Sequence, residues 1–231
     1  KVQDGDRIKE QVVDRQGQGP RGSQEVNVQD GNAQIVAAVQ FAPVLLDVGR
    51  NISTAQQLSF EAGAKGARII VLPELCTGGN VFRQPYEAAS CAQESDGYQT
   101  QAMTEVSQPS EERWPVVVTA EGRIGVLICR DAMNRYRESY AFHRSGQRFY
   151  PKGSVDSIAL VTNWGESYGY PDSSWVELVE ETRANLIVSN RVGSERDMTY
   201  KGGSCVIDRN RRIWTNGSSF TEAAVVGGVI L

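Results

Sequence analysis

Three apolar runs that each end abruptly in a polar residue constrain the fold of this chain more than any other feature. They read "ARIIVLPEL", "GVLICRD" and "IALVTNW". Continuous apolar runs of this length are typical of strands that are covered on both faces. Polar groups gather at the carboxyl ends of such strands, because the chain leaves the sheet there. The polar residues that follow these three strands, Glu74, Cys129 and Asn163, are therefore candidates for one site.

Strands and helices alternate in the first half of the folded pattern. A compact apolar strand over 35–39 is followed by Pro43, which cannot continue it. The spacing of apolar residues over 51–67 predicts a helix that is capped by Asn51 or Ser53. A further helix is expected over 98–106.

The second half is richer in hairpins. Two strands over 115–129 are joined by a turn at Glu121-Gly122, and a later pair turns at Arg209-Asn210. Residues 135–146 are expected to be helical, and 173–184 form an amphipathic helix. The apolar face of that helix carries Trp175, Leu178, Val179 and Thr182. The pattern as a whole predicts a layered α/β domain whose sheets are covered by helices.

The folded pattern covers only part of the chain. Residues 1–32 are polar, without sustained periodicity, and are expected to form an arm or disordered tail. Residues 33–231 are expected to form one domain, since 231 residues suffice for one large domain.

Composition excludes several classes of function. A net charge of −4 gives no reason to expect nucleic acid or an anionic membrane as a partner. No apolar run approaches a membrane span, and the first residues lack the apolar core of a signal peptide. The four cysteines lie far apart without CxxC spacing, which favours free thiols in a reducing cytoplasm. His143 is the only histidine, so sites with several histidine ligands are excluded, and we expect no metal and no organic cofactor.

The strand ends themselves indicate a chemistry. A carboxyl group at the position of Glu74 is partly desolvated, which raises its pKa and suits it to accept a proton. A thiol at Cys129 that loses its proton to Glu74 is a nucleophile for a carbonyl or nitrile carbon, and the backbone N–H of Arg130 is placed for the oxyanion. The alternative is structural, because a strand cysteine is more often buried than reactive.

Several blocks in order resemble one known family. They are "IVAAVQFAP", "GAKGARIIVLPEL", "GRIGVLICRD", "VTNW" and "NRVGSE…YKGGSCVID", and they span roughly residues 33–231. Together they resemble the nitrilase superfamily, the carbon-nitrogen hydrolases. The resemblance implies an α-β-β-α sandwich that pairs into an α-β-β-α-α-β-β-α dimer, so a homodimer or larger homo-oligomer is expected.

The resemblance also implies a Glu-Lys-Cys site. Glu74 in "LPEL" matches the family's general base, and Cys129 in "LICRD" matches its nucleophile, which forms a covalent acyl or thioimidate intermediate. Glu111 in "EERW" matches a second, supporting Glu. Asn163 and Trp164 match a position that borders the substrate pocket.

The catalytic Lys of the family has no counterpart. The lysines are Lys1, Lys9, Lys65, Lys152 and Lys201, and none falls between Glu74 and Cys129. That interval is several tens of residues shorter than is usual in the family. A true deletion would remove sheet strands and expose sheet edges. We therefore favour the alternative, in which the protein has a segment there that is missing from the printed sequence.

The residues after Cys129 bear on the substrate. Arg130-Asp131 resemble the Cys-x-Asp pattern of amidases and carbamoyl hydrolases rather than the Cys-Trp-Glu of true nitrilases. We expect hydrolysis of a linear amide or N-carbamoyl C–N bond in a small molecule, with release of ammonia. Arg130 is either a surface residue or a partner for a substrate carboxylate. The alternatives are nitrile hydrolysis, an inactive member acting as a binding or assembly module, and the glutaminase part of a larger synthetase.

Overall fold

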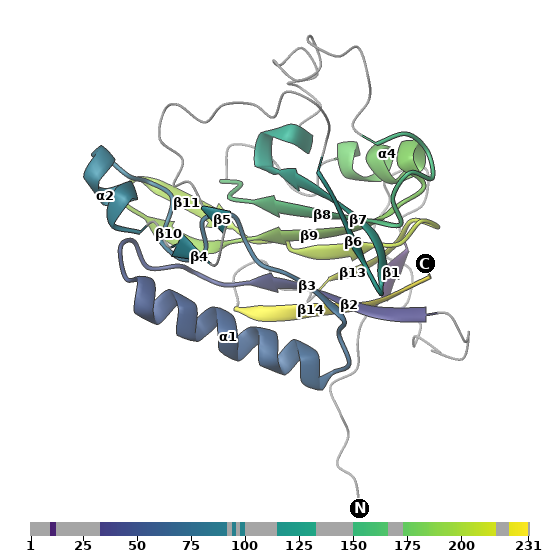
Figure 1. The fold of residues 1–231 in the computed structure, drawn as a ribbon, viewed down its shortest axis with the longest axis horizontal. Helices are drawn as coiled ribbons and strands as arrows, with labels where there is room; N and C mark the ends of the chain where they lie inside the picture. Colours follow the sequence, from purple (N-terminus) through teal and green to yellow (C-terminus); the bar gives the residue numbers. More distant parts are fainter. Residues whose placement is uncertain are drawn as a thin grey trace, which may run out of the picture.

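The computed structural model describes residues 10–12, 33–91, 94–95, 98–99, 115–132, 150–165, 173–215 and 222–230. Within these residues two β-sheets face each other, and helices lie against their outer sides (Figure 1). The layers follow the order α-β-β-α, so the predicted sandwich is confirmed.

The larger sheet has seven strands in the order β1-β13-β12-β9-β8-β7-β6. Their bounds are β1 Glu10–Val12, β6 Val116–Thr119, β7 Gly122–Ile128, β8 Ser157–Thr162, β9 Asn185–Asn190, β12 Cys205–Ile207 and β13 Arg212–Thr215. Strands β7, β8 and β9 are parallel neighbours, and the other pairings are antiparallel. The carboxyl ends of β7 and β8 therefore meet at one edge of this sheet.

The smaller sheet has the order β14-β2-β3, with β2 and β3 parallel. Its bounds are β2 Ala33–Gln40, β3 Ile69–Val71 and β14 Ala223–Ile230. The other elements are α1 Val48–Ala64, α2 Pro85–Ser90, β4 Glu94–Ser95, β5 Tyr98–Gln99, the 3₁₀ turn η1 Cys129–Ala132, α4 Ser173–Thr182, β10 Val192–Glu195 and β11 Met198–Lys201. Within the described ranges β3 pairs with β2 alone, so its other side is an edge of the sheet.

Three apolar layers hold the sandwich together. The central one joins the sheets, with Val36, Val71 and Val225 from the smaller sheet and Ile187 and Trp214 from the larger one. A second cluster packs α4 on the larger sheet, and two others pack α1 on the smaller sheet. Burial on both faces explains why the strands read as unbroken apolar runs.

Most sequence predictions for single elements are confirmed. The strand over 35–39, the turn at Arg209-Asn210 and the helix over 173–184 are present. The predicted face of that helix is buried; its residues Trp175, Leu178, Val179 and Thr182 are at most 7% exposed. The hairpin predicted at Glu121-Gly122 turns one residue earlier, at Ala120-Glu121, because Gly122 already pairs with Thr119.

The predicted cap of α1 is wrong. Asp47 is the N-cap, and its carboxylate accepts the N–H of Arg50 at 3.2 Å. Asn51 is buried inside the helix, and its side chain exchanges hydrogen bonds with the backbone of Val44 and donates to the carbonyl of Thr77. Ser53 donates to the carbonyl of Gly49 one turn earlier. The Asn51 side chain therefore joins the segment before α1, at Val44, to the loop after β3, at Thr77.

Two other predictions concern the poorly patterned regions. Tyr98–Gln99 pair with Glu94–Ser95 as a short antiparallel strand rather than starting a helix, and the remainder of 98–106 lies outside the described residues, as does 135–146. In the polar N-terminal segment, Glu10–Val12 pair with β13, which its composition did not predict.

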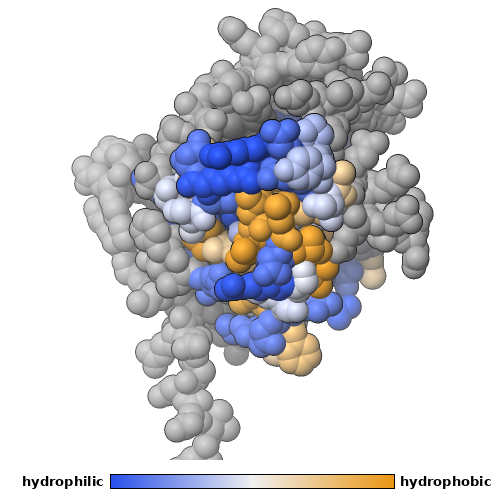
Figure 2. All heavy atoms as spheres, turned by 90° about the vertical axis from the view of Figure 1, so that its left-hand side faces the viewer, coloured by the Kyte–Doolittle hydropathy of each residue, from blue (hydrophilic) through white to orange (hydrophobic). Residues whose placement is uncertain are grey.

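The end of the molecule that carries α2 and the start of α1 has a mixed surface. Figure 2 shows an apolar area between hydrophilic areas on this side. Val44 and Leu46, just before α1, are among the exposed apolar side chains, at 37% and 41% exposure. Among the helices that the structure describes, none combines the length and apolar character needed to cross a membrane.

Gly125 lies under an aromatic ring in β7, and its substitution is expected to destabilise the fold. A Cβ there would lie 2.6 Å from the ring of Tyr150. That ring is fixed, because its hydroxyl accepts the N–H of Val126 at 2.9 Å and donates to Pro115 at 2.8 Å. Gly125→Ala should lower the free energy of unfolding by about 2 kcal/mol through overpacking, measured by urea denaturation.

The matched control is Gly63→Ala in α1. No atom lies within 4 Å of a Cβ at Gly63. The helical propensity of alanine should therefore raise stability there by up to about 1 kcal/mol. A Gly125→Ala protein as stable as wild type would show that the Tyr150 ring is free to move.

Candidate active site

Cys129 lies at the point where β7 ends and η1 begins. Its φ of 44° is in the left-handed region, which costs a residue with a Cβ roughly 1 kcal/mol. Such strain persists where the surrounding structure fixes it, and it is frequent at functional sites. The side chain is partly buried and packs against the cluster beneath α4. The backbone thus turns the thiol out of the strand direction.

Glu74 lies in the loop that follows β3, after Leu72-Pro73. The next residue, Leu75, also has a left-handed φ, at 49°. The loop closes on itself, because the N–H of Gly79 donates to the carbonyl of Leu75 at 3.0 Å. Asn51 holds the carbonyl of Thr77 in the same loop at 2.9 Å. Glu74 therefore projects from a loop whose following residues are held by hydrogen bonds.

The structure brings Glu74 and Cys129 together from the two sheets. Their side chains lie close enough for the Cys129 thiol to act as a hydrogen-bond donor toward the Glu74 carboxylate. Burial raises the pKa of Glu74 to about 7, although the hydrogen bond from Cys129 opposes this shift. Burial, followed by the negative charge of Glu74, raises the pKa of the Cys129 thiol to about 12. At neutral pH the proton therefore belongs to the sulfur, and Glu74 is poised near half ionisation.

Asn163, at the end of β8, contacts both members of this pair. Its backbone N–H lies toward the Glu74 carboxylate and the Cys129 sulfur and lowers the pKa of each. Its side chain is 7% exposed, yet neither the amide nitrogen nor the amide oxygen has a hydrogen-bond partner in the described part of the protein. A buried amide without partners is costly, so this group is suited to bind a ligand that supplies one donor and one acceptor.

Trp164 forms the next part of the wall. Its ring stacks on Trp175 of α4, with 4.8 Å between ring centroids. Asn190 of β9 accepts its backbone N–H at 2.8 Å and donates to its carbonyl. The indole N–H is close enough to Cys129 to lower the pKa of the thiol, but it meets no acceptor with hydrogen-bonding geometry among the described residues. It is thus a second unused donor beside the thiol.

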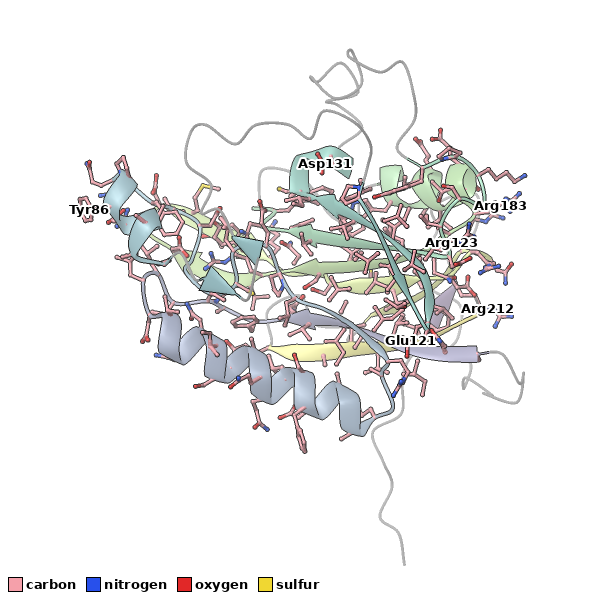
Figure 3. All side chains as sticks on the ribbon, in the orientation of Figure 1. Tyr86, Glu121, Arg123, Asp131, Arg183 and Arg212 are labelled. Carbon is pink, nitrogen blue, oxygen red and sulfur yellow. The ribbon has the colours of Figure 1, made fainter. Side chains whose placement is uncertain are left out.

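Asp131 anchors the turn after the nucleophile. It accepts the N–H of Ile128 at 2.8 Å and lies in η1 beyond the end of β7 (Figure 3). Its negative charge also contributes to raising the pKa of Glu74.

The side chains of two other predicted site residues lie outside the described part of the structure. The backbone of Arg130 lies in η1, but its side chain, like the whole of Glu111, is outside the described part of the structure. Of the lysines, Lys65, Lys152 and Lys201 are described, and all three are exposed. Among the described residues no cationic side chain shifts the pKa of Glu74 or Cys129.

Tyr200 of β11 was not predicted from the sequence. It is fully buried, and this burial is the largest cause that raises the pKa of its hydroxyl. The negative charge of Glu74 raises that pKa further. Its hydroxyl accepts a hydrogen bond from Asn80 at 2.8 Å. In the sequence Tyr200 is one aromatic residue in a short hairpin. Its position directly before "KGGS" is the only signal that could have pointed to the site.

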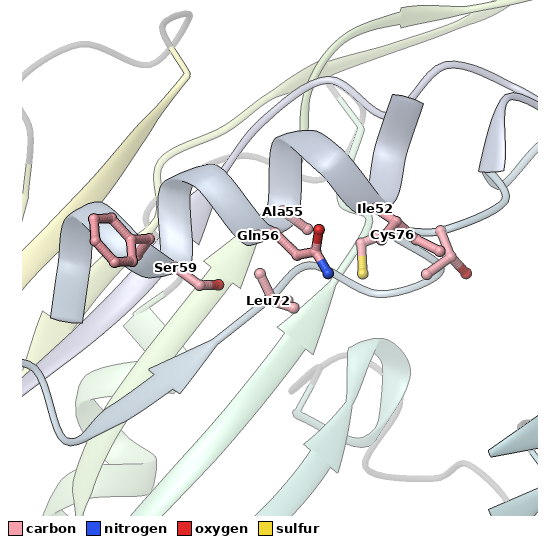
Figure 4. A pocket seen from close by; sticks show the side chains of 8 residues that line it. Ile52, Ala55, Gln56, Ser59, Leu72 and Cys76 are labelled. Carbon is pink, nitrogen blue, oxygen red and sulfur yellow. The ribbon is translucent and has the colours of Figure 1, made fainter. Parts of the chain in front are cut away.

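A separate apolar pocket of about 500 Å³ lies between α1 and the segment after β3. Figure 4 shows its lining from Ile52, Ala55 and Gln56 of α1 together with Leu72 and Cys76. Neither Glu74 nor Cys129 lines this pocket, so it is separate from the candidate active site. The described residues hold no group of three or more side chains suited to bind a metal ion.

Comparisons with known proteins identify the family and the fold. The model of the carbon-nitrogen hydrolase family matches residues 35–109. A protein named nitrilase from Pyrococcus abyssi (strain GE5 / Orsay) is 32% identical over 237 positions, which cover 85% of this chain and 89% of that protein. Since 85% of 231 residues fill fewer than 237 positions, the alignment opens gaps in this chain.

Solved structures show the same fold. An amidase from Nesterenkonia sp. superposes with a TM-score of 0.64 at 14% identity, covering 88% of this chain and 93% of the amidase. The glutamine-dependent NAD⁺ synthetase from Acinetobacter baumannii superposes with a TM-score of 0.61 at 17% identity. The match covers 85% of this chain but only 45% of the synthetase. By sequence similarity over most of its length, and in agreement with its fold, the chain belongs to the nitrilase superfamily of carbon-nitrogen hydrolases.

Proposed function

We propose that this protein hydrolyses a linear amide or N-carbamoyl C–N bond of a small molecule through a covalent intermediate on Cys129, with Glu74 as general base. The observation that carries the proposal is the proximity of the Glu74 carboxyl group and the Cys129 thiol, which are close enough to shift each other's pKa. A base must be within hydrogen-bond reach of the proton that it removes, and its pKa should lie near the working pH. Glu74, with a pKa of about 7, meets both conditions.

The reaction has two halves. Glu74 takes the proton of Cys129 as the sulfur attacks the carbonyl carbon, and the tetrahedral intermediate collapses when the amide nitrogen receives that proton and leaves as ammonia. Water then attacks the thioester, Glu74 takes a proton from it, and the acid product leaves as the thiol regains its proton. The thiolate never needs to exist free, which suits a thiol with a pKa of about 12.

The buried amide of Asn163 favours an amide or carbamoyl substrate over a nitrile. A primary amide offers both an N–H donor and a carbonyl acceptor, so it satisfies both ends of the unpartnered Asn163 side chain. A nitrile offers an acceptor alone and leaves the Asn163 oxygen unsatisfied. The indole N–H of Trp164 and the backbone N–H of Arg130 are the proposed donors to the oxyanion, and Glu111 is proposed to support the site.

The test is ammonia release from a panel of linear amides, N-carbamoyl compounds and nitriles. We expect turnover of amide or carbamoyl compounds with kcat/KM about 5- to 150-fold above the matched nitriles, because an unmet buried polar group costs about 1–3 kcal/mol. Asn163→Leu, which removes the amide but keeps the volume, should reduce this preference to a few-fold. A wild-type enzyme that prefers nitriles would reverse the assignment of the substrate.

An inactive family member acting as a binding module is the second candidate, and one observation favours it. The tetrahedral intermediate carries a negative charge on its oxygen, and no described cationic side chain lies within electrostatic reach of Glu74 or Cys129 to stabilise it. Complete absence of ammonia release across the panel, with folded protein, would support this candidate. Fusion to, or purification with, an ATP-using protein would instead indicate the glutaminase part of a synthetase.

We also propose that the protein forms a homodimer or larger homo-oligomer, as the family resemblance implies. Sedimentation equilibrium gives the mass in solution directly, and a mass near 25.3 kDa at micromolar concentration would exclude this.

A further inference from the structure

The hairpin β10–β11 contacts the loop that carries Glu74. Glu195 at the end of β10 accepts the backbone N–H groups of Asn80, at 2.8 Å, and of Val81. These residues follow the closed turn at Leu75–Gly79. A carboxylate that accepts two adjacent backbone N–H groups fixes the position of that backbone.

A buried cation pairs with Glu195 in this position. Arg191 donates to the other oxygen of Glu195 at 2.7 Å, and the two side chains are 1% and 3% exposed. The second guanidinium nitrogen donates to the carbonyl of Pro43 at 2.9 Å, and the guanidinium lies 4.3 Å from the ring centroid of Tyr200. Charged groups rarely stay buried unless they are paired and hydrogen-bonded in this way.

Tyr200 connects this ion pair to the reacting groups. Its hydroxyl accepts the side-chain N–H of Asn80 at 2.8 Å, its ring covers Arg191, and it lies within electrostatic reach of Glu74. Its backbone also forms a β-bridge with Gly165, directly after Trp164. One hairpin therefore contacts the loop of the base and the loop of Asn163 and Trp164.

We propose that the β10–β11 hairpin is a positioning element for the reacting pair, in which Tyr200 and Glu195 hold the Asn80 loop so that Glu74 stays within reach of Cys129. The inference rests on the proposed function, because it assigns Glu74 the role of base. Neither residue touches the thiol, so both are positioning residues. Among the described residues, the charged and titratable groups around Glu74 are Cys129, Asp131 and Tyr200. Arg191 forms an ion pair with the more distant Glu195.

The test is the rate at which iodoacetamide alkylates Cys129, followed by peptide mass spectrometry from pH 5.5 to 9, together with kcat and KM for the best substrate. Tyr200→Phe removes the hydroxyl but keeps the ring over Arg191. We expect its alkylation rate at pH 7.5 and its kcat to fall about tenfold or more, with KM changed by less than about twofold, because small displacements of a catalytic group have effects up to about a hundredfold. The midpoint of the rise in rate with pH should also move.

Ser194→Ala is the matched control on the same hairpin. It removes an exposed hydrogen bond to Thr199 and points away from the loop, so the rate, midpoint and kcat should equal those of wild type. Asn80→Ala breaks the same contact from the other side. If the contact acts as one unit, the Tyr200→Phe/Asn80→Ala double variant should lose no more than the more affected single variant.

Two results would overturn the inference: a Tyr200→Phe protein that behaves like Ser194→Ala, or additive losses in the double variant. Failure of the proposed function is a different result, namely wild-type protein without turnover and without a levelling of the alkylation rate above pH 7. Circular dichroism verifies that each variant is folded. If Tyr200→Phe does not fold, the comparison of Asn80→Ala with Ser194→Ala tests the inference instead.

Discussion

Glu74→Gln is expected to lower kcat/KM by a factor of about 10³ or more and, at pH 8, to make the protein more stable. The loss of activity follows because glutamine still accepts the hydrogen bond of the Cys129 thiol but cannot take its proton. General bases contribute about 10²–10⁴-fold, and here the base also acts in the second half of the reaction.

The gain in stability has a definite direction with pH. Folding raises the pKa of Glu74 from 4.5 to about 7, so the folded state binds this proton more tightly than the unfolded state. The resulting stabilisation is complete below pH 4.5 and is lost as the pH rises through 7. The loss corresponds to about 3 kcal/mol. Glu74→Gln carries no such charge. Its free energy of unfolding relative to wild type should therefore increase by about 3 kcal/mol between pH 4.5 and 8.

Urea denaturation of both proteins at pH 4.5, 6 and 8 measures this difference. Glu61→Gln is the control, because it removes an exposed carboxylate from α1. Its stability should follow that of wild type over the same range. An unchanged difference between wild type and Glu74→Gln at all three pH values would mean that Glu74 is solvated in the folded protein.

Cys129→Ala is expected to abolish turnover, with a loss of about 10⁴-fold or more. No other described nucleophile lies beside Glu74, and removal of a nucleophile costs up to about 10⁶-fold in enzymes of this type of chemistry. Cys129→Ser should be nearly as inactive, since the pKa of a serine hydroxyl is far above that of a thiol and the geometry around the sulfur is set by a strained backbone.

Cys76→Ala is the matched control for this prediction. Cys76 lies only two residues from Glu74, but it lines the separate apolar pocket. Its removal should leave kcat/KM within about twofold of wild type, because it contacts neither reacting group. Equal ammonia release by wild type and Cys129→Ala would show that the thiol is not the nucleophile.

The strands that carry the site were predictable from the sequence for one physical reason. Strands buried on both faces must be apolar throughout, so their ends are marked by a sudden change in polarity at Glu74, Cys129 and Asn163. Parallel pairing of β7 and β8 then brings two of these ends to one edge. The predicted proximity of Glu74 and Cys129 is found in the structure, although their catalytic roles stay a prediction.

Other parts of the site could not be predicted, because they depend on contacts between distant segments. The left-handed backbone at Cys129 is imposed by its surroundings, since nothing in its residue type favours it. Tyr200 reaches Asn80 across 120 positions of the chain. The Asp47 cap was missed because Asn51 and Ser53 are equally good capping residues by type, and only the packed loops decide between them.

The interval between Glu74 and Cys129 shows where the sequence and the fold still differ from the family pattern. β3 lies at the edge of its sheet in the described part of the chain, and the interval begins directly after it. The gaps opened in the alignment with the Pyrococcus protein also fit a shortened interval. A sheet edge without a partner strand is prone to pair with other chains. We therefore favour an interval that is longer in the protein than in the printed sequence.

The most direct test of the Glu74–Cys129 pair is the pH dependence of Cys129 alkylation by iodoacetamide in wild type and Glu74→Gln. If Glu74 takes the thiol proton, the wild-type rate should rise with pH through about 7 and then level off, because the base is by then fully ionised. The Glu74→Gln rate should be lower at pH 7 and rise about tenfold per pH unit up to pH 9, as expected for a buried thiol that ionises by itself. Identical profiles for the two proteins, rising without a plateau, would contradict the pairing of base and nucleophile.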